Sequence, residues 1–369
     1  MTERELCIAL NMISGIGSGR YQALLEAFGS PDGVRLAERG DLMGVDGVGK
    51  VIAERIINFD WDAELSRELT FAARGDVKIV TLADADYPAD LRELFDPPLC
   101  LYIRGKLPEN SARSIAIVGS RRISAYGERM AGVLAQDAVG CGFTVFSGMA
   151  LGADSAAHLS VVECNGRTVG VLGSGLGQMY PKENIPLARQ IIHSGGAVIS
   201  EFPLNFPVNK FNFPRRNRIV AAMCRAVIVV EAGVESGAMI TARLAAEMGR
   251  EVFAVPGRVD NIQAKGCHKL IKEGAGLIEN FDDVLVSLNS GLRPGELERK
   301  IADDAEMSGN LTPDCQIVYD TLKQYGECDL ERLQELTGMS SGMLLSILMK
   351  LELKILVERD AEHFYHLIS

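Results

Sequence analysis

Five basic residues and several aromatic rings gather in one short stretch of an otherwise acidic chain. Residues 201–225 contain these five basic residues and a single acidic residue, Glu201. The stretch therefore carries a net charge of +4, whereas the 369-residue chain carries −11. Phosphates attract basic side chains and unpaired bases stack on aromatic rings, so the stretch favours a single-stranded nucleic acid as its ligand. The alternative is a surface loop whose arginines pair with local acids. The five bases are Lys210, Arg215, Arg216, Arg218 and Arg225.

Four other residues have types and spacing that could support acid–base chemistry. Asp154 and His158 lie four residues apart, so they share one face of a helix and could form an acid–base pair. A helix-capping aspartate beside a buried, hydrogen-bonded histidine explains the same pair more simply. Glu231 and Glu235 could be catalytic carboxylates, but Glu231 could equally accept hydrogen bonds from nearby backbone N–H groups or from an arginine.

Three common enzyme signatures are missing from the sequence. The first predicted strand is followed by Gly119-Ser120-Arg121, whereas a nicotinamide dehydrogenase needs G-x-G-x-x-G there. Neither the phosphate-binding loop of ATPases nor the G-x-S-x-G turn of serine hydrolases is present. These absences argue against the three corresponding enzyme classes.

From Ser114 onward, short apolar runs rich in β-branched residues alternate with helical segments. This alternation predicts an α/β fold built on an extended Rossmann-like, doubly wound parallel sheet. The strands are apolar almost throughout, as strands are when helices cover both faces of a sheet. The predicted strands are Ile115–Val118, Phe143–Ser147, Thr168–Leu172, Ala197–Glu201, Ala226–Glu231 and Glu251–Val255.

The candidate binding residues follow the carboxyl ends of these strands, where parallel sheets bind their ligands. Gly119 to Arg122 follow the first strand, Gly148 and Gly152 follow the second, and Ser236-Gly237 follows the fifth. Several of these loops run into a helix N-terminus, where bare N–H groups favour anions. The basic stretch follows the fourth strand, so we expect all of them to lie at one edge of the sheet.

Two smaller modules flank the predicted sheet. Residues 1–60 contain Gly15-Ile16-Gly17 and Gly47-Val48-Gly49, each followed by a helix, which is typical of a SAM-like helix-hairpin-helix module. Such turns contact phosphates in nucleic-acid binders, and otherwise the module serves only for packing. We predict a connecting segment at 61–110, the Rossmann-like domain at 111–290, a linker at 291–312 and a winged-helix domain at 313–369.

The predicted winged-helix domain is acidic. Together with most of the preceding linker, from residue 293 onward, it holds eight Lys or Arg and fifteen Asp or Glu, a net charge of −7. Its predicted recognition helix has no cation before Lys350. Winged helices usually bind DNA, but this charge favours protein–protein contact or packing within the chain.

Composition sets further bounds on the protein. No apolar run is long enough to span a bilayer, and the N-terminus lacks a secretion signal, so we expect a cytoplasmic protein with no membrane partner. The eight cysteines are scattered without a C-x-x-C pair, so we expect neither a disulfide framework nor a metal site. A pI near 5.1 argues against a general duplex binder.

Several motifs, in order along the chain, carry a resemblance to a known family. They include GSRRISAYG at 119–127, FSGMALGADSAAH at 146–158, FPRRNRIVA at 213–221 and VVEAGVESGAMITAR at 229–243. The chain resembles the DNA-processing protein A family of bacteria, also called Smf. The resemblance implies a protein without catalytic residues or cofactor that binds single-stranded DNA, protects incoming strands during natural transformation and helps to load the RecA recombinase.

The resemblance also implies where DNA and a second subunit bind. Family contacts to DNA correspond to Arg121 and to the loop holding Phe213, Arg215, Arg216 and Arg218. Family members form homodimers through the segment that corresponds to 266–275, which places Leu270 and Ile271 at the interface. The full set of predicted DNA-binding residues is Gly119, Ser120, Arg121, Arg122, Gly148, Gly152, Lys210, Phe211, Phe213, Arg215, Arg216, Arg218, Ser236 and Gly237.

An enzyme is the alternative. The predicted fold also resembles nucleotide-binding phosphoribohydrolases of the lysine-decarboxylase-like group. Their P-G-G-x-G-T-x-x-E loop corresponds roughly to residues 231–241, but the double glycine and the downstream acid are absent here. The departure favours a site that binds anions without catalysis.

Overall fold

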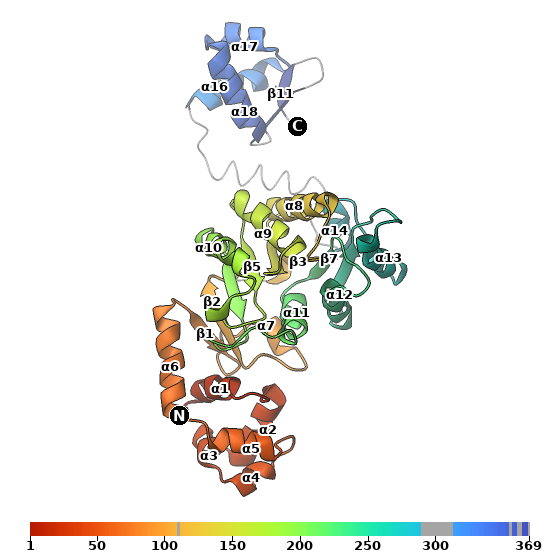
Figure 1. The fold of residues 1–369 in the computed structure, drawn as a ribbon. Helices are drawn as coiled ribbons and strands as arrows, with labels where there is room; N and C mark the ends of the chain where they lie inside the picture. The colour runs from red at the N-terminus through yellow and green to blue at the C-terminus, as the bar shows by residue number, and fades with distance from the viewer. Residues whose placement is uncertain (109–110, 289–312, 354–355, 360–363, 368–369) are drawn as a thin grey trace. The chain divides into compact units, whose positions relative to one another are not determined.

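The computed structural model describes residues 1–108, 111–288, 313–353, 356–359 and 364–367. The chain divides into two compact units, Met1–Leu288 and Asn289–Ser369, which are described separately below (Figure 1). The linker predicted at 291–312 lies outside the described residues. Within the described parts of the chain, each helix is too short or too polar to cross a lipid bilayer.

A nine-stranded sheet forms the centre of the first unit, in the order β1-β2-β6-β5-β4-β3-β7-β8-β9. Its strands from β3 onward run parallel to one another. All six strands predicted from apolar runs are present, each within about two residues of its expected ends, so the predicted Rossmann-like fold is confirmed. The parallel strands are β3 (Ser114–Val118), β4 (Thr144–Gly148), β5 (Thr168–Val171), β6 (Ala197–Ser200), β7 (Ala226–Val229), β8 (Glu251–Ala254) and β9 (Gly276–Leu277).

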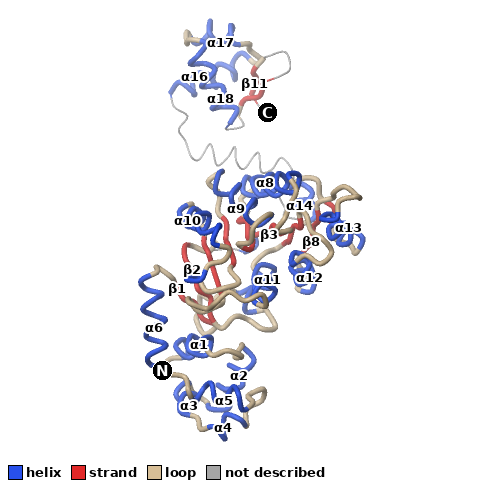
Figure 2. Tube along the Cα trace, viewed as in Figure 1, coloured by secondary structure: helices blue, strands red, loops and turns tan. Residues whose placement is uncertain are grey.

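Helices cover both faces of this sheet, as Figure 2 shows. Ile115 and Ile117 of β3 pack with the helices of one face, whereas the alternate residues Ala116 and Val118 pack with those of the other. The first face is covered by α8 (Ala125–Gly140), α9 (Ala153–Glu163), α10 (Ile185–His193) and α14 (Phe281–Ser287). The second is covered by α7 (Ala89–Arg92), α11 (Asn212–Ala222), α12 (Gly237–Glu247) and α13 (Lys265–Lys272).

Residues 61–110, predicted as a connecting segment, contribute two strands to the sheet. After α6 (Trp61–Arg74), β1 (Lys78–Thr81) pairs antiparallel with β2 (Cys100–Gly105), and β2 pairs antiparallel with β6. The apolar residues of these short strands are buried, which explains why they join the sheet rather than cross its surface. The sheet is therefore mixed, with two antiparallel strands at one end.

Five short helices precede the sheet: α1 (Glu3–Met12), α2 (Ser18–Phe28), α3 (Pro31–Leu36), α4 (Arg39–Met43) and α5 (Lys50–Ile57). The two glycine turns lie directly before α2 and α5, as predicted. Arg20 joins the turns, because its side chain donates to the carbonyl of Gly47 at 2.6 Å and to that of Gly15 at 2.7 Å. The guanidinium of Arg20 therefore forms hydrogen bonds inside the helical module.

The helical module packs against the antiparallel end of the sheet. Its core includes Cys100 and Tyr102 of β2 and also Leu204, which follows β6. At the first glycine turn, Asp96 accepts hydrogen bonds from the hydroxyl of Ser18 at 2.9 Å and from its N–H at 3.4 Å. A carboxylate of the same chain therefore lies where the turn would bind a phosphate.

Among its described residues, the second unit holds three helices followed by two antiparallel strands that pair with each other. Its core includes Val318, Leu333, Leu344 and Leu348. This order of elements agrees with the prediction, and the assignment to the winged-helix class stays a prediction. The elements are α16 (Pro313–Tyr325), α17 (Leu330–Thr337), α18 (Ser341–Leu353), β10 (Val357–Arg359) and β11 (Tyr365–Leu367).

The contact between Asp96 and α2 yields a test of stability. We predict that Asp96→Ala lowers the free energy of unfolding by roughly 1 kcal/mol, because the substitution removes the carboxylate that caps a helix N-terminus. Urea denaturation would measure the change. The control is Glu54→Ala, whose carboxylate pairs with Arg39 at 2.6 Å and is 43% exposed; a surface pair of this kind contributes about 0.5 kcal/mol or less. Equal losses in both variants would contradict the prediction.

Candidate nucleic-acid interface

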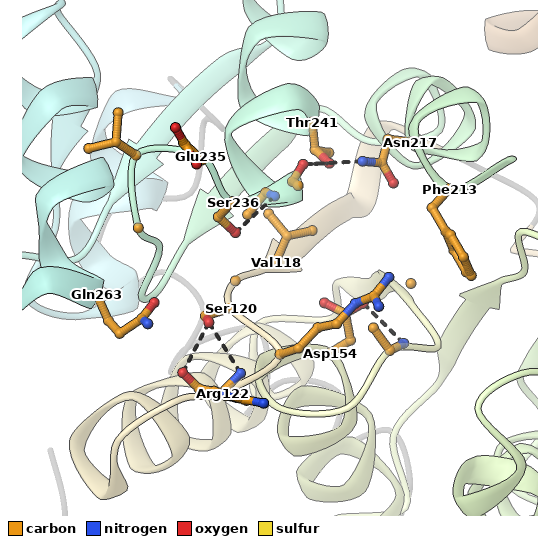
Figure 3. Close-up of a pocket in the computed structure, with 18 of the residues that line it drawn as sticks. Val118, Ser120, Arg122, Asp154, Phe213, Asn217, Glu235, Ser236, Thr241 and Gln263 are labelled. Atoms are coloured by element: carbon orange, nitrogen blue, oxygen red, sulfur yellow. Dashed lines mark hydrogen bonds between the residues drawn. The ribbon is translucent and has the colours of Figure 1, made fainter. Parts of the chain in front are cut away.

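A cleft of about 760 Å³ opens at the carboxyl ends of β3, β4 and β7 (Figure 3). Figure 3 shows Ser236, before α12, on the opposite side of the opening from Ser120 and Arg122, with Phe213 at the border. The cleft brings together nine of the predicted DNA-binding residues: Gly119, Ser120, Arg121, Arg122, Gly148, Phe213, Arg216, Ser236 and Gly237. The topology of the sheet explains this gathering, because these loops leave neighbouring parallel strands at one edge.

Two predicted glycines allow the walls of the cleft to pack closely. A side chain at Gly148 would collide with the guanidinium of Arg216 and the carboxylate of Asp154, and one at Gly152 would collide with the carbonyl of Ser120. Gly152 does not line the cleft. The geometry therefore assigns both glycines a packing role, and leaves their contact with DNA a prediction.

The turn after β3 uses part of its hydrogen-bonding capacity internally. The N–H of Ser120 donates to the carbonyl of Glu231 at 2.6 Å, and the N–H of Arg122 donates to the hydroxyl of Ser120 at 3.2 Å. These two N–H groups already donate to acceptors within the chain, so they are not available to bind a phosphate. The side chains of Arg121 and Arg122 are exposed and supply its positive charge.

An exposed cation stands over an aromatic ring at the border of the cleft. The guanidinium of Arg121 lies 5.0 Å from the centre of the Phe213 ring, within the range of a cation–π contact. Tyr180 lies beside the same ring, with the two ring centres 6.1 Å apart. Side chains from two loops and from the first turn of α11 therefore form one surface that suits both a phosphate and a flat base.

Arg216 lines the cleft but is buried. Its guanidinium donates to the carbonyl of Val171 and, at 3.1 Å, to the side-chain oxygen of Asn217. Burial lowers the pKa of Arg216, and burial also raises the pKa of Asp154, an effect that the charge of Arg216 opposes. The sequence predicted Arg216 as one of the best phosphate contacts. Its charge faces internal groups of the protein, and its contact with DNA stays a prediction.

Arg215 and Arg218 both pair with the buried carboxylate of Glu201, at 3.0 and 2.6 Å. The Arg218 side chain is only 13% exposed, so little of it faces solvent, and its predicted phosphate contact stays a prediction. The Arg215 side chain is 44% exposed and lies 5.5 Å above the centre of the Phe202 ring. Of the two, Arg215 is the one whose charge faces solvent.

Lys210 and Phe211 are exposed on the loop before α11 and do not line the cleft. The ammonium of Lys210 lies 5.2 Å from the centre of the Phe211 ring, which is 72% exposed. The pair repeats on this loop the combination of cation and ring seen at Arg121 and Phe213. Its contact with DNA stays a prediction.

Two of the four candidate acid–base residues, His158 and Glu231, have structural roles. His158 is fully buried between the hydroxyl of Thr168, at 2.7 Å, and the carbonyl of Gly148, at 2.8 Å, and burial lowers its pKa to about 4. Glu231 accepts from the N–H of Ser124 and from the side chain of Asn261, both at 2.8 Å. The simpler interpretations of His158 and Glu231 are confirmed, and Glu235 lines the cleft as an exposed acid.

Sequence reasoning missed several residues that line the cleft or adjoin it. Neither Tyr180 nor Asn217 was predicted to contact DNA, although Tyr180 borders Phe213 and Asn217 lines the cleft. Lys265 reaches the cleft from the start of α13, far along the chain from the other residues. No local pattern marks Lys265, because only the pairing of β8 and β9 places α13 at this edge.

The residues predicted at a dimer interface lie on α13. Leu270 is buried in the core of its own chain, and Ile271 packs partly against the same core. Leu270 therefore has little surface left for a partner. The homodimer and its interface stay predictions.

Comparison with protein families decides the relationship. Residues 78–289 match the family described as DNA recombination-mediator protein A, and residues 8–59 match a SAM-like helix-hairpin-helix tandem. The chain belongs to the DNA recombination-mediator protein A family. The second match confirms the helix-hairpin-helix prediction for the N-terminal module.

Two relatives illustrate the similarity. Protein Smf of Escherichia coli (strain K12) is 42% identical over 211 residues, which cover 57% of this chain and 56% of that protein. The DNA processing protein DprA of Streptococcus pneumoniae (strain ATCC BAA-255 / R6) is 38% identical over 248 residues, which cover 67% of this chain and 85% of that protein. The match thus spans little more than half of the Escherichia coli relative.

Two solved structures share the fold. The crystal structure of DNA processing protein A from Streptococcus pneumoniae has a TM-score of 0.65 at 35% identity and covers 78% of this chain and 98% of that one. The structure of DNA processing protein A from Helicobacter pylori, described for its single-stranded DNA binding mode, has a TM-score of 0.51 at 29% identity. It covers 58% of this chain and 97% of that one.

The buried histidine predicts a pH dependence of stability. The pKa of His158 falls from 6.5 to about 4 on folding, so the unfolded chain binds a proton in this range that the folded chain excludes. Stability should therefore fall as the pH drops from about 6.5 towards 4, with His158 accounting for about 2 to 3 kcal/mol of the loss. We predict that His158→Gln removes this part of the slope in urea unfolding experiments. His193→Gln, at an exposed histidine, is the control, and equal slopes in all three proteins would contradict the assignment.

Proposed function

We propose that this chain binds single-stranded DNA across the cleft at the carboxyl ends of β3, β4 and β7, with little sequence preference. The observation that carries the proposal is the exposed guanidinium of Arg121 above the ring of Phe213 at the border of the cleft. The Helicobacter pylori neighbour, whose structure concerns single-stranded DNA binding, supports the same ligand. Bound DNA would place phosphates near the cations and bases against the rings.

The exposed residues are proposed to contact DNA, and the buried ones to maintain the shape of the cleft. Arg121, Arg122 and Lys265 bring exposed positive charge to the cleft, and Arg215 adds charge from the first turn of α11. The exposed pair of Lys210 and Phe211 extends this surface along the loop before α11. In this proposal Gly119, Ser120, Gly148, Ser236 and Gly237 form the backbone of the cleft, whereas Gly152, Arg216 and Arg218 hold its shape.

The cleft acts, in this proposal, as a binding site without catalysis. Asp154 and Glu235 are the carboxylates that line it. Asp154 is buried and faces Arg216, so the only carboxylate exposed within the lining is Glu235. A phosphoribohydrolase would release the base from a nucleoside monophosphate, so base release by the purified protein would overturn this part of the proposal.

The names of the relatives suggest the process in which such binding is used. Relatives in Streptococcus pneumoniae and Bacillus subtilis are named DNA processing protein DprA, and the family is described as a recombination mediator. We infer that this protein acts in the cytoplasm as a homodimer, protects incoming single strands during natural transformation and helps to load the RecA recombinase. A shorter lag in RecA assembly on DNA coated with a single-strand-binding protein would support loading, and an unchanged lag would contradict it.

Arg121 offers the most direct test of the proposal. We predict that Arg121→Ala raises the dissociation constant for a labelled single-stranded oligonucleotide. The substitution should also reduce the salt dependence of binding by about 0.7 in the log–log slope, the amount expected for one phosphate contact to a single strand. Fluorescence anisotropy at two salt concentrations measures both quantities.

The matched control is Arg67→Ala, which removes a 57%-exposed arginine from α6. This variant should bind like the wild type, since Arg67 lies in the helical part of the chain away from the cleft lining. If Arg121→Ala kept wild-type affinity and slope, the cleft would not be the DNA site.

The acidic second unit allows a further prediction. A chain ending at residue 288 retains the whole first unit, including the cleft. We predict that it binds single-stranded DNA at least as tightly as the full chain, because the deleted part carries a net charge of −7 from residue 293 onward and would repel phosphates. Loss of binding in the shortened chain would show that the second unit contributes to the DNA site.

A further inference from the structure

A small apolar hollow adjoins the cleft. Arg121, Ala150, Phe213 and Arg216 line both spaces, so the hollow of about 40 Å³ continues directly from the larger one. Its remaining walls are largely apolar and come from the ends of β4 and β5 and from the loop before α10. They are formed by Met149, Leu151, Val171, Leu172, Tyr180 and Pro181, with the backbone of Gly173.

Tyr180 is exposed at the border of this hollow although nothing in the fold uses its polar group. The side chain is 45% exposed, and its hydroxyl has no hydrogen-bond partner among the described residues. Its ring centre lies 6.1 Å from that of Phe213, and the two ring planes make an angle of 53°. At this separation and tilt a base cannot fit between the rings, so the free face of Tyr180 is the one open to a ligand.

The loop that carries Tyr180 is fixed at its base. The side chain of Asn184 donates to the carbonyl of Met149 at 2.9 Å and to the hydroxyl of Ser155 at 2.8 Å. These bonds join the loop to the end of β4 and to α9, so the ring is held at the edge of the sheet. An exposed ring held in one place binds a flat ligand at low cost in conformational entropy.

We propose that Tyr180 stacks on one nucleobase of bound single-stranded DNA, with the edge of that base directed into the hollow. This inference rests on the proposed function. It adds a binding residue and a physical reason why the protein would bind single-stranded DNA in preference to duplex. The cleft is lined by cations and suits phosphates, whereas the adjoining hollow is largely apolar and suits a base. The two spaces therefore match the charged backbone and the flat bases of a single strand. In a duplex the faces of the bases are covered by their neighbours, so Tyr180 selects unpaired DNA.

The first test compares variants of Tyr180 on single-stranded and duplex oligonucleotides. Tyr180→Leu should weaken binding to a short single strand by roughly fivefold to a hundredfold, the range expected for one base stacked on an aromatic ring. Tyr180→Phe keeps the ring and should bind like the wild type. Any weak binding to duplex should stay unchanged in both variants, and Phe71→Ala, at a 38%-exposed ring on α6, is the control.

A second measurement does not depend on the stability of Tyr180→Leu. The chain has one tryptophan, Trp61, which is buried in the core of the helical module. In Tyr180→Trp the new tryptophan should therefore report on stacking, with fluorescence quenched by a normal oligonucleotide. Quenching should be lost when an abasic site replaces one particular nucleotide of a short oligonucleotide. Equal quenching for every position of the abasic site would overturn the proposal.

The outcomes separate this proposal from the proposed function. If Arg121→Ala weakens binding while Tyr180→Leu does not, the cleft binds DNA and the stacking role of Tyr180 is wrong. If the wild-type protein does not bind single-stranded DNA, both proposals fail together. If Tyr180→Leu weakens duplex binding as much as single-strand binding, the ring has a structural role and does not select unpaired bases.

Discussion

The buried guanidinium of Arg216 holds together the edge of the sheet on which the cleft depends. It donates to the carbonyl of Val171 at the end of β5, and it faces the carboxylate of Asp154 on α9 across Gly148. Removing this cation would leave Asp154 buried without an opposing charge, which is far more costly than losing a surface pair. The floor of the cleft thus contains two opposite charges inside the protein, on either side of Gly148, with the groups proposed to bind DNA arranged above them.

A second internal contact limits the positive charge of the same region. Glu201 is buried beneath Arg215 and Arg218, and its backbone carbonyl accepts a hydrogen bond at 3.0 Å from the side chain of Asn11 in α1. The helical module therefore contacts the start of the segment that leads into the basic cluster. Much of the charge that the sequence displays is neutralised within the chain, and the aromatic rings gain importance for binding accordingly.

The sheet was predictable because buried parallel strands leave a direct trace in the sequence, a run of apolar β-branched residues between helical segments. The gathering of loops at one edge followed from that topology. What could not be predicted was the direction of adjacent side chains. Helix α11 begins at Asn212, so the arginines occupy a helical turn in which successive residues point about 100° apart. Arg215 consequently faces solvent while Arg216 faces the core, a difference that composition does not encode.

The antiparallel strand β2 sets an order in which the chain can fold during synthesis. Tyr102 of β2 pairs with Ser200 of β6, and the core of the helical module includes Leu204. Although the module is made first, its apolar core stays incomplete until the ribosome has produced most of the parallel strands. The N-terminal part of the protein therefore reaches its final packing only after β6 has been made, and a chain interrupted before residue 204 would expose apolar surface that the complete protein buries.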